Sequence, residues 1–268
     1  MKICSFLYCP APASYPAAAA MLENLKRFPP KHDLVLYSEH DHGWPGQIKL
    51  KISPEVVKTF NGPAYNGKQD FRISNVCFLT GLQIIRNQGY THAIALEADC
   101  RVGCKDWDDA IFSEYFSLGR PCITAGSLAF YNPANHSAKA LSKWQAIVAL
   151  NTARNFPCPT YGWVGAADKH PSCVFPNGAL SVVDVTWMQR LFALENAVSE
   201  AVNMGPWDMV IGQKIWEMFA EDAYEVTGQI GCIFSGYGDI VTTESQRLEM
   251  LRTGRVVAIH QVKSAEQP

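Results

Sequence analysis

Two acidic residues separated by one position, Glu97 and Asp99, form the pattern in this chain that is best suited to chemistry. They follow an apolar run, Tyr90 to Leu96, that is typical of a buried strand. In an open α/β sheet, ligands bind outside the carboxyl ends of the strands. Two carboxylates at such an end indicate a bound cation. A hard divalent ion would take oxygen ligands, keep some of its waters and bind phosphates on its open side.

The segments around this pair predict alternating strands and helices. Before it we expect a strand over Lys2 to Cys9, a helix from Pro16 to Phe28, a strand over Asp33 to Tyr37 and an amphipathic helix over Gln69 to Asn87. After it we expect helices over Asp106 to Leu118, Ala138 to Leu150 and Asp184 to Ser199, and strands over Cys122 to Ala125, Asn177 to Val183 and Val256 to Ile259. This alternation predicts an α/β fold with a mostly parallel central sheet flanked by helices.

The composition narrows the function classes. The chain has 268 residues, of which 48% are hydrophobic and 18% charged, enough for one domain with a substantial core. A net charge of −2 gives no basic footprint for nucleic acid. No apolar run reaches the roughly 20 residues that span a bilayer. Nine irregularly spaced cysteines and no secretory leader lead us to expect a cytoplasmic protein with reduced thiols.

Further candidate residues lie on both sides of the acidic pair. Arg72 and Asn75 share one face near the start of their helix and can reach the same ligand. Asp208 begins a helix after Gly205-Pro206, where it could either stabilise the helix end or take part in chemistry. His260 follows the last strand. His40-Asp41-His42 has ligand types at tight spacing, but the surrounding Gly and Pro residues favour a solvated loop.

The order of these features resembles the GT-A glycosyltransferases, which bind a nucleotide-diphosphate sugar in a Rossmann-like domain. An acidic pair follows a strand, an acid begins a later helix, and a histidine with a nearby lysine lies close to the C-terminus. Leu96-Glu97-Ala98-Asp99 stands where the family has its Asp-x-Asp motif. The resemblance implies a single GT-A-like domain over residues 1–268, with a nucleotide-binding half (1–125) and a donor-sugar and acceptor half (126–268).

The resemblance also implies a metal site. Asp99 and His260 would ligate a divalent cation, for which manganese suits a mixed oxygen and nitrogen set and magnesium is the other choice. Glu97 would contact the ribose or a metal-bound water, and Lys263 would lie near the diphosphate. The family has Asp at the first acidic position, so Glu97 is a departure. Its carboxylate reaches further by about one C–C bond, which leaves its effect on metal dependence open.

The remaining roles follow from the same resemblance. Asp208 would be the catalytic base of an inverting transfer, accepting the proton of an acceptor hydroxyl. The nucleotide and donor sugar, with a UDP-sugar expected first, would contact Pro10, Arg72, Asn75, Asn177 and Gly178. Aromatic residues would form the acceptor wall: Tyr161 and Trp163 in the long loop predicted over Asn155 to Pro176, and Trp207. The acceptor is left open between a glycan, a small molecule, a protein and a modified nucleic-acid base.

Two other functions fit the same pattern. A sugar-1-phosphate nucleotidyltransferase also combines a nucleotide, a metal and acids, but it normally has a Gly-rich basic loop after the first strand. Here that turn is Pro10-Ala11-Pro12-Ala13-Ser14. A non-catalytic nucleotide-sugar or glycan-binding domain would keep the fold and would need neither Asp99 nor Asp208.

Overall fold

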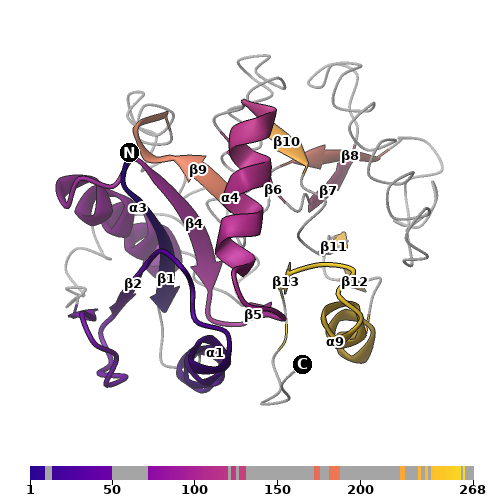
Figure 1. The fold of residues 1–268 in the computed structure, drawn as a ribbon, viewed down its shortest axis with the longest axis horizontal. Coiled ribbons are helices and arrows are strands. Elements are labelled where there is room, and N and C mark those ends of the chain that lie inside the picture. Colours follow the sequence, from indigo (N-terminus) through magenta and orange to yellow (C-terminus); the bar gives the residue numbers. More distant parts are fainter. Residues whose placement is uncertain are drawn as a thin grey trace.

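A computed structural model of the chain describes twelve stretches, the longest at residues 14–49, 72–119 and 243–260. The others are residues 1–9, 122–124, 127–130, 172–175, 181–187, 224–226, 235–236, 239–240 and 262. The described residues form a seven-stranded sheet with helices on its two faces, shown in Figure 1. None of the helices in these stretches is both long enough and apolar enough to cross a membrane.

The central sheet is mostly parallel, with the strand order β10-β6-β9-β4-β1-β2-β3. Its strands are β1 (Ile3–Cys9), β2 (Asp33–Ser38), β3 (Ile48–Lys49), β4 (His92–Glu97), β6 (Cys122–Thr124), β9 (Ser181–Asp184) and β10 (Tyr224–Val226). Only β9 runs against its neighbours, β4 and β6; the other four pairings in the sheet are parallel. The predicted α/β fold with a mostly parallel sheet is therefore confirmed.

The two faces of the sheet are covered by different helices. On one face, α1 (Tyr15–Arg27) and α4 (Trp107–Leu118) pack their apolar residues against alternate positions of β1, β2 and β4. On the other face, α3 (Arg72–Asn87) brings Phe78 against the ring of Tyr8. Because both faces are covered, β1 and β4 are buried along nearly their whole length, which explains their largely apolar sequences.

One predicted loop contains a strand. The segment expected as loop over Asn155 to Pro176 includes β8 (Ser172–Phe175), which pairs antiparallel with β7 (Ser127–Phe130). This pairing is non-local, so no nearby turn or periodicity reveals it. Downstream, the helix expected from Asp184 begins directly after β9, and Asp184 caps its start, because the backbone N–H of Trp187 donates to Asp184 Oδ1 at 2.9 Å. The helix predicted over Ala138 to Leu150 lies outside the described residues.

The C-terminal part of the chain packs beside the acidic pair. Helix α9 (Glu244–Arg252) begins with a capping box formed by Thr243 and Gln246. It leads to β13 (Ala258–Ile259), which pairs antiparallel with β5 (Arg101–Val102), the short strand just after Asp99. A separate two-stranded pair consists of β11 (Ser235–Gly236) and β12 (Asp239–Ile240). The β5–β13 pair determines which C-terminal residues reach the acids.

A buried amide attaches β5 to helix α1. Asn24 is fully buried, and its Nδ2 donates to the carbonyl of Val102 at 3.0 Å. In return, the Val102 N–H donates to Asn24 Oδ1 at 2.8 Å. The side chain therefore acts as a strand partner for β5 on the side away from β13, and it satisfies two backbone groups that would otherwise be buried without partners.

Replacing Asn24 with Ala should destabilise the fold by about 2 to 4 kcal/mol, because it leaves two buried backbone groups of Val102 without partners. The free energy of unfolding in urea measures this loss. Gln83→Ala is the matched control, since the side-chain amide of Gln83 donates an exposed hydrogen bond to Asn87 Oδ1 at 2.8 Å. Loss of this hydrogen bond should change the free energy of unfolding by less than about 0.5 kcal/mol. Equal effects from the two changes would contradict a structural role for Asn24.

Candidate metal centre

Glu97 and Asp99 lie at the carboxyl end of β4, as the sequence predicts. Glu97 is the last residue of the strand, and the chain then turns sharply, with the Cys100 N–H donating to the Glu97 carbonyl at 3.1 Å. Asp99 therefore lies in the turn that follows the strand, two residues after Glu97. Both side chains are partly exposed, Glu97 at 32% and Asp99 at 20%, so solvent reaches the pair.

His260 completes a group of three ligand-type side chains. Its Nε2 lies 2.9 Å from Glu97 Oε2 and 2.9 Å from Asp99 Oδ1. One ligand atom from each residue falls within 4.8 Å of the others. The β5–β13 pairing positions this histidine, together with a hydrogen bond of 2.9 Å from the Val262 N–H to the Asp99 carbonyl. The structure thus brings together Asp99 and His260, for which the sequence predicts a shared metal site, and their role as metal ligands stays a prediction.

The charges of the acids determine the protonation of the histidine. His260 is 8% exposed. Burial alone lowers its pKa, but the charge of Asp99 and the hydrogen bonds to Asp99 and Glu97 outweigh burial and raise the pKa of His260 above its ordinary value. The other ring nitrogen, Nδ1, has no hydrogen-bond partner among the described residues, so Nε2 makes both polar contacts of the ring.

Two buried arginines, Arg101 and Arg247, interact electrostatically with Asp99. The guanidinium of Arg101 donates from Nη1 to the carbonyl of Cys100 at 2.6 Å and to that of Ala98 at 3.4 Å. It therefore braces the turn that carries Asp99. Arg247 on α9 is also buried, and burial lowers its pKa while the charges of Glu244 and Asp99 oppose that change. The charges of both arginines interact with that of Asp99, so they offset part of its negative charge.

Sequence reasoning missed Tyr8, a further residue that contacts the group. Its hydroxyl donates to Glu97 Oε1 at 2.6 Å, and its side chain is almost completely buried. The contact exists because β1 and β4 are neighbours in a register that pairs Tyr8 with Glu97. A tyrosine near the end of the first strand was visible in the sequence, but its partner depends on strand order and register, which local patterns do not reveal.

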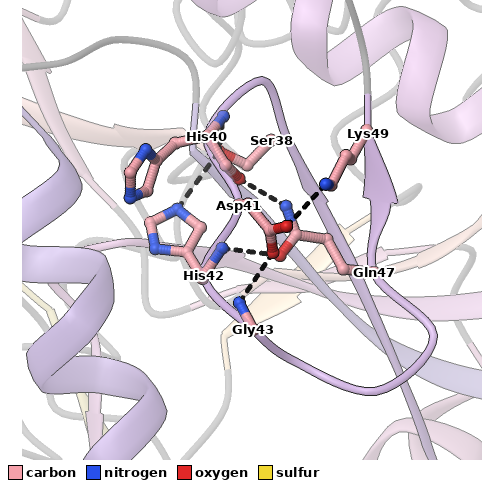
Figure 2. Close-up of polar contacts among 7 residues, drawn as sticks. All are labelled: Ser38, His40, Asp41, His42, Gly43, Gln47 and Lys49. Atoms are coloured by element: carbon pink, nitrogen blue, oxygen red, sulfur yellow. Dashed lines mark hydrogen bonds and ion pairs between the residues drawn. The ribbon is translucent and has the colours of Figure 1, made fainter.

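The histidines after β2 belong to a different group, shown in Figure 2. Asp41 pairs with Lys49 at 2.5 Å and accepts from the Gly43 N–H at 2.9 Å. His42 Nε2 lies 3.2 Å from Ser38 Oγ, and the side chain of Gln47 bonds to the backbones of His40 and His42. These polar groups hold the loop closed on itself, which fits the interpretation of His40-Asp41-His42 as a loop segment.

The other predicted site residues are not tested by the described structure. Arg72 and Asn75 lie in the first turns of α3, and the structure describes their backbone only. The residues predicted for the nucleotide, donor, base and acceptor that lie outside the described stretches are Pro10, Tyr161, Trp163, Asn177, Gly178, Trp207, Asp208 and Lys263. Their roles stay predictions.

Comparison with known proteins gives likenesses among solved structures. No protein-family model and no curated protein matches the sequence. The apo form of mouse xyloside xylosyltransferase 1 is similar over 100% of this chain and 99% of its own, at 10% identity and a TM-score of 0.44. Core-mannan synthase A from Aspergillus fumigatus, in an Mn/GDP form, is similar over 90% of this chain and 76% of its own, at 8% identity and a TM-score of 0.48.

A third similar structure is a glycosyltransferase involved in the glycosylation of the major capsid of PBCV-1. It is similar over 99% of this chain and 96% of its own, at 10% identity and a TM-score of 0.43. At these identities the likeness concerns the fold alone, and it places no individual residue.

The raised pKa of His260 predicts how stability depends on pH in the metal-free protein. A folded-state pKa above the unfolded value of about 6.5 stabilises the fold fully below that pH, and the stabilisation is lost as pH rises through the folded pKa. The gap in unfolding free energy between the wild type and His260→Gln should therefore shrink as the pH rises from 6 to 10. A gap that stays constant over this range would contradict the ion-pair geometry.

Proposed function

We propose that this protein is a metal-dependent glycosyltransferase of the GT-A type, which moves a sugar from a nucleotide-diphosphate sugar to an acceptor hydroxyl. The observation that carries the proposal is the group of Glu97, Asp99 and His260 at the carboxyl end of β4. Ligands of open α/β sheets bind at this edge. The group therefore combines a place for a nucleotide with ligands for the cation that a diphosphate needs.

The ligand types fit a divalent cation. Two carboxylates and an imidazole, with one atom from each within 4.8 Å, are a mixed oxygen and nitrogen set that suits manganese, with magnesium as the other choice. Calcium prefers six to eight oxygens and fits less well. Three protein ligands would leave coordination positions for diphosphate oxygens and water. The close approach of two negative carboxylates is itself favourable only when a positive charge lies between them.

Without a metal, a proton on His260 can balance the negative charge of Glu97 and Asp99. Nε2 of His260 lies 2.9 Å from an oxygen of each acid, so a protonated ring lies where a cation would be held. A ligating imidazole must be neutral, so binding of a cation should release this proton. When bound, the cation would stabilise the negative charge that develops on the leaving diphosphate.

The chain's own residues would carry the other steps. The acceptor oxygen would form a bond to the anomeric carbon while the bond from that carbon to the diphosphate breaks. Asp208, by the family resemblance, would accept the hydroxyl proton if the reaction inverts. Lys263 would lie near the diphosphate, and Arg72 and Asn75 would face the nucleotide. A UDP-sugar is the first donor to test, and the class of acceptor is left to experiment.

Nucleotide binding that depends on a metal is the direct test. UDP or GDP with Mn²⁺ should raise the melting temperature of the wild type by several degrees, and the shift should be smaller without the metal. Asp99→Ala should abolish the metal-dependent part, because it removes one of three ligands. Asp109→Ala is the matched control, since Asp109 is an exposed acid on α4 whose Oδ2 lies 2.8 Å from Lys31 Nζ. It should keep the full shift.

The outcomes of this test separate the alternatives. If no nucleotide stabilises the wild type under any metal condition, the proposal fails. Metal-dependent binding without turnover of any sugar nucleotide would favour a non-catalytic binding domain. Release of diphosphate from a nucleoside triphosphate and a sugar-1-phosphate would favour a nucleotidyltransferase.

The role proposed for Asp208 separates binding from chemistry. Asp208→Asn should leave metal-dependent nucleotide binding unchanged and lower sugar transfer by about 100-fold or more, because an amide cannot accept the hydroxyl proton. Release of the nucleoside diphosphate from a sugar donor in the presence of acceptor measures the transfer. Transfer at the wild-type rate would rule out Asp208 as the base and would favour a retaining mechanism or a different base.

A further inference from the structure

We propose that Tyr8 is a positioning residue of the metal site: its hydroxyl fixes the carboxylate of Glu97 so that Oε2 is presented to the cation together with Asp99 and His260. This inference rests on the metal site proposed above. It also makes Glu97 a metal ligand, whereas the family resemblance alone gives it a contact with the ribose or with a metal-bound water.

The hydroxyl of Tyr8 is held in a fixed place. Tyr8 pairs with Glu97 across the β1–β4 ladder, so the two side chains leave neighbouring strands at the same level. Its ring stacks on Phe6 at 5.8 Å and meets the edge of Phe78 at 5.7 Å, and only 1% of the residue is exposed. Core packing on both sides leaves the ring little freedom to move. The donor is therefore part of the rigid sheet.

Because of this donor, the two oxygens of Glu97 have different partners. Oε1 accepts from Tyr8 at 2.6 Å, a length typical of a hydroxyl bonded to an ionised carboxylate. Oε2 then lies 2.9 Å from His260 Nε2, inside the ligand group. A glutamate that is 32% exposed and held by His260 alone could still turn one carboxylate oxygen toward water. The bond from Tyr8 removes that freedom before any cation arrives, which favours binding.

The same contact accounts for the glutamate at the first acidic position. A longer side chain has more rotatable bonds than aspartate and needs a second attachment to hold its carboxylate in one place. Tyr8 on one side and His260 on the other provide these attachments. In metal sites, partners that orient a ligand are commonly worth about 10- to 100-fold in metal affinity.

The competing explanation is that the bond only satisfies a buried hydroxyl. The chain contains a matched case at the opposite edge of the sheet, where the hydroxyl of Tyr90 donates to Asp33 Oδ2 at 2.7 Å. Tyr90 is also buried. It lies just before the start of β4, whereas Glu97 is the last residue of that strand. Both tyrosine-carboxylate bonds can contribute to stability, but only that of Tyr8 contacts the ligand group.

The experiment compares Tyr8→Phe with Tyr90→Phe in the full-length protein. Both changes remove one hydroxyl and keep the ring, so both variants should fold, and the melting temperature of the metal-free proteins checks this. Mn²⁺ affinity is measured by electron paramagnetic resonance, and the visible spectrum of bound Co²⁺ reports the ligand geometry. Tyr8→Phe should weaken Mn²⁺ binding by about tenfold or more and change the Co²⁺ spectrum. Tyr90→Phe should match the wild type in both measurements.

Three results would overturn the inference, and they are distinguishable. Wild-type affinity and an unchanged Co²⁺ spectrum in Tyr8→Phe would leave the metal site intact and show that Tyr8 has only a structural role. Equal losses in the two variants would assign the effect to general destabilisation. A wild-type protein that binds neither Mn²⁺ nor Co²⁺ would refute the metal site itself, and the role of Tyr8 with it.

Discussion

The repulsion between two carboxylates held close together at the edge of a sheet is the constraint on which the rest of this structure depends. Glu97 and Asp99 each approach His260 Nε2 to 2.9 Å, so a positive charge at this position relieves the repulsion between them. In the metal-free protein the imidazolium of His260 supplies that charge, which is why its pKa is raised. A divalent cation would supply it in the functional protein.

The surrounding elements keep this costly arrangement in place. The core on both faces fixes β1 and β4, and with them Tyr8 and Glu97. The buried guanidinium of Arg101 donates to the carbonyls of Ala98 and Cys100 and so stabilises the turn that carries Asp99. The β5–β13 pair, held on its other side by Asn24, brings His260 from the far end of the chain. The site is thus preorganised by contacts from four separate segments, and a change in any one of them should alter the charge balance.

The sequence predicted those parts that depend on local signals. The apolar run before Glu97, the helix over Asp106 to Leu118 and the cap at Asp184 all have short-range patterns, and the structure agrees with them. The family resemblance, and not a local pattern, assigned Asp99 and His260 to one site. Strand β8 and the contact of Tyr8 with Glu97 could not be read from the sequence, because both depend on pairing between distant segments. The roles of residues such as Asp208 rest on the resemblance alone.

The central claim is that Glu97, Asp99 and His260 bind one divalent cation. Anomalous diffraction from crystals of the protein grown with Mn²⁺ and a nucleoside diphosphate tests it most directly. The account predicts one manganese peak about 2 Å from an oxygen of each acid and from His260 Nε2, with diphosphate oxygens completing its coordination. A manganese ion bound elsewhere, or a nucleotide bound at this edge with no manganese beside the three residues, would contradict the account.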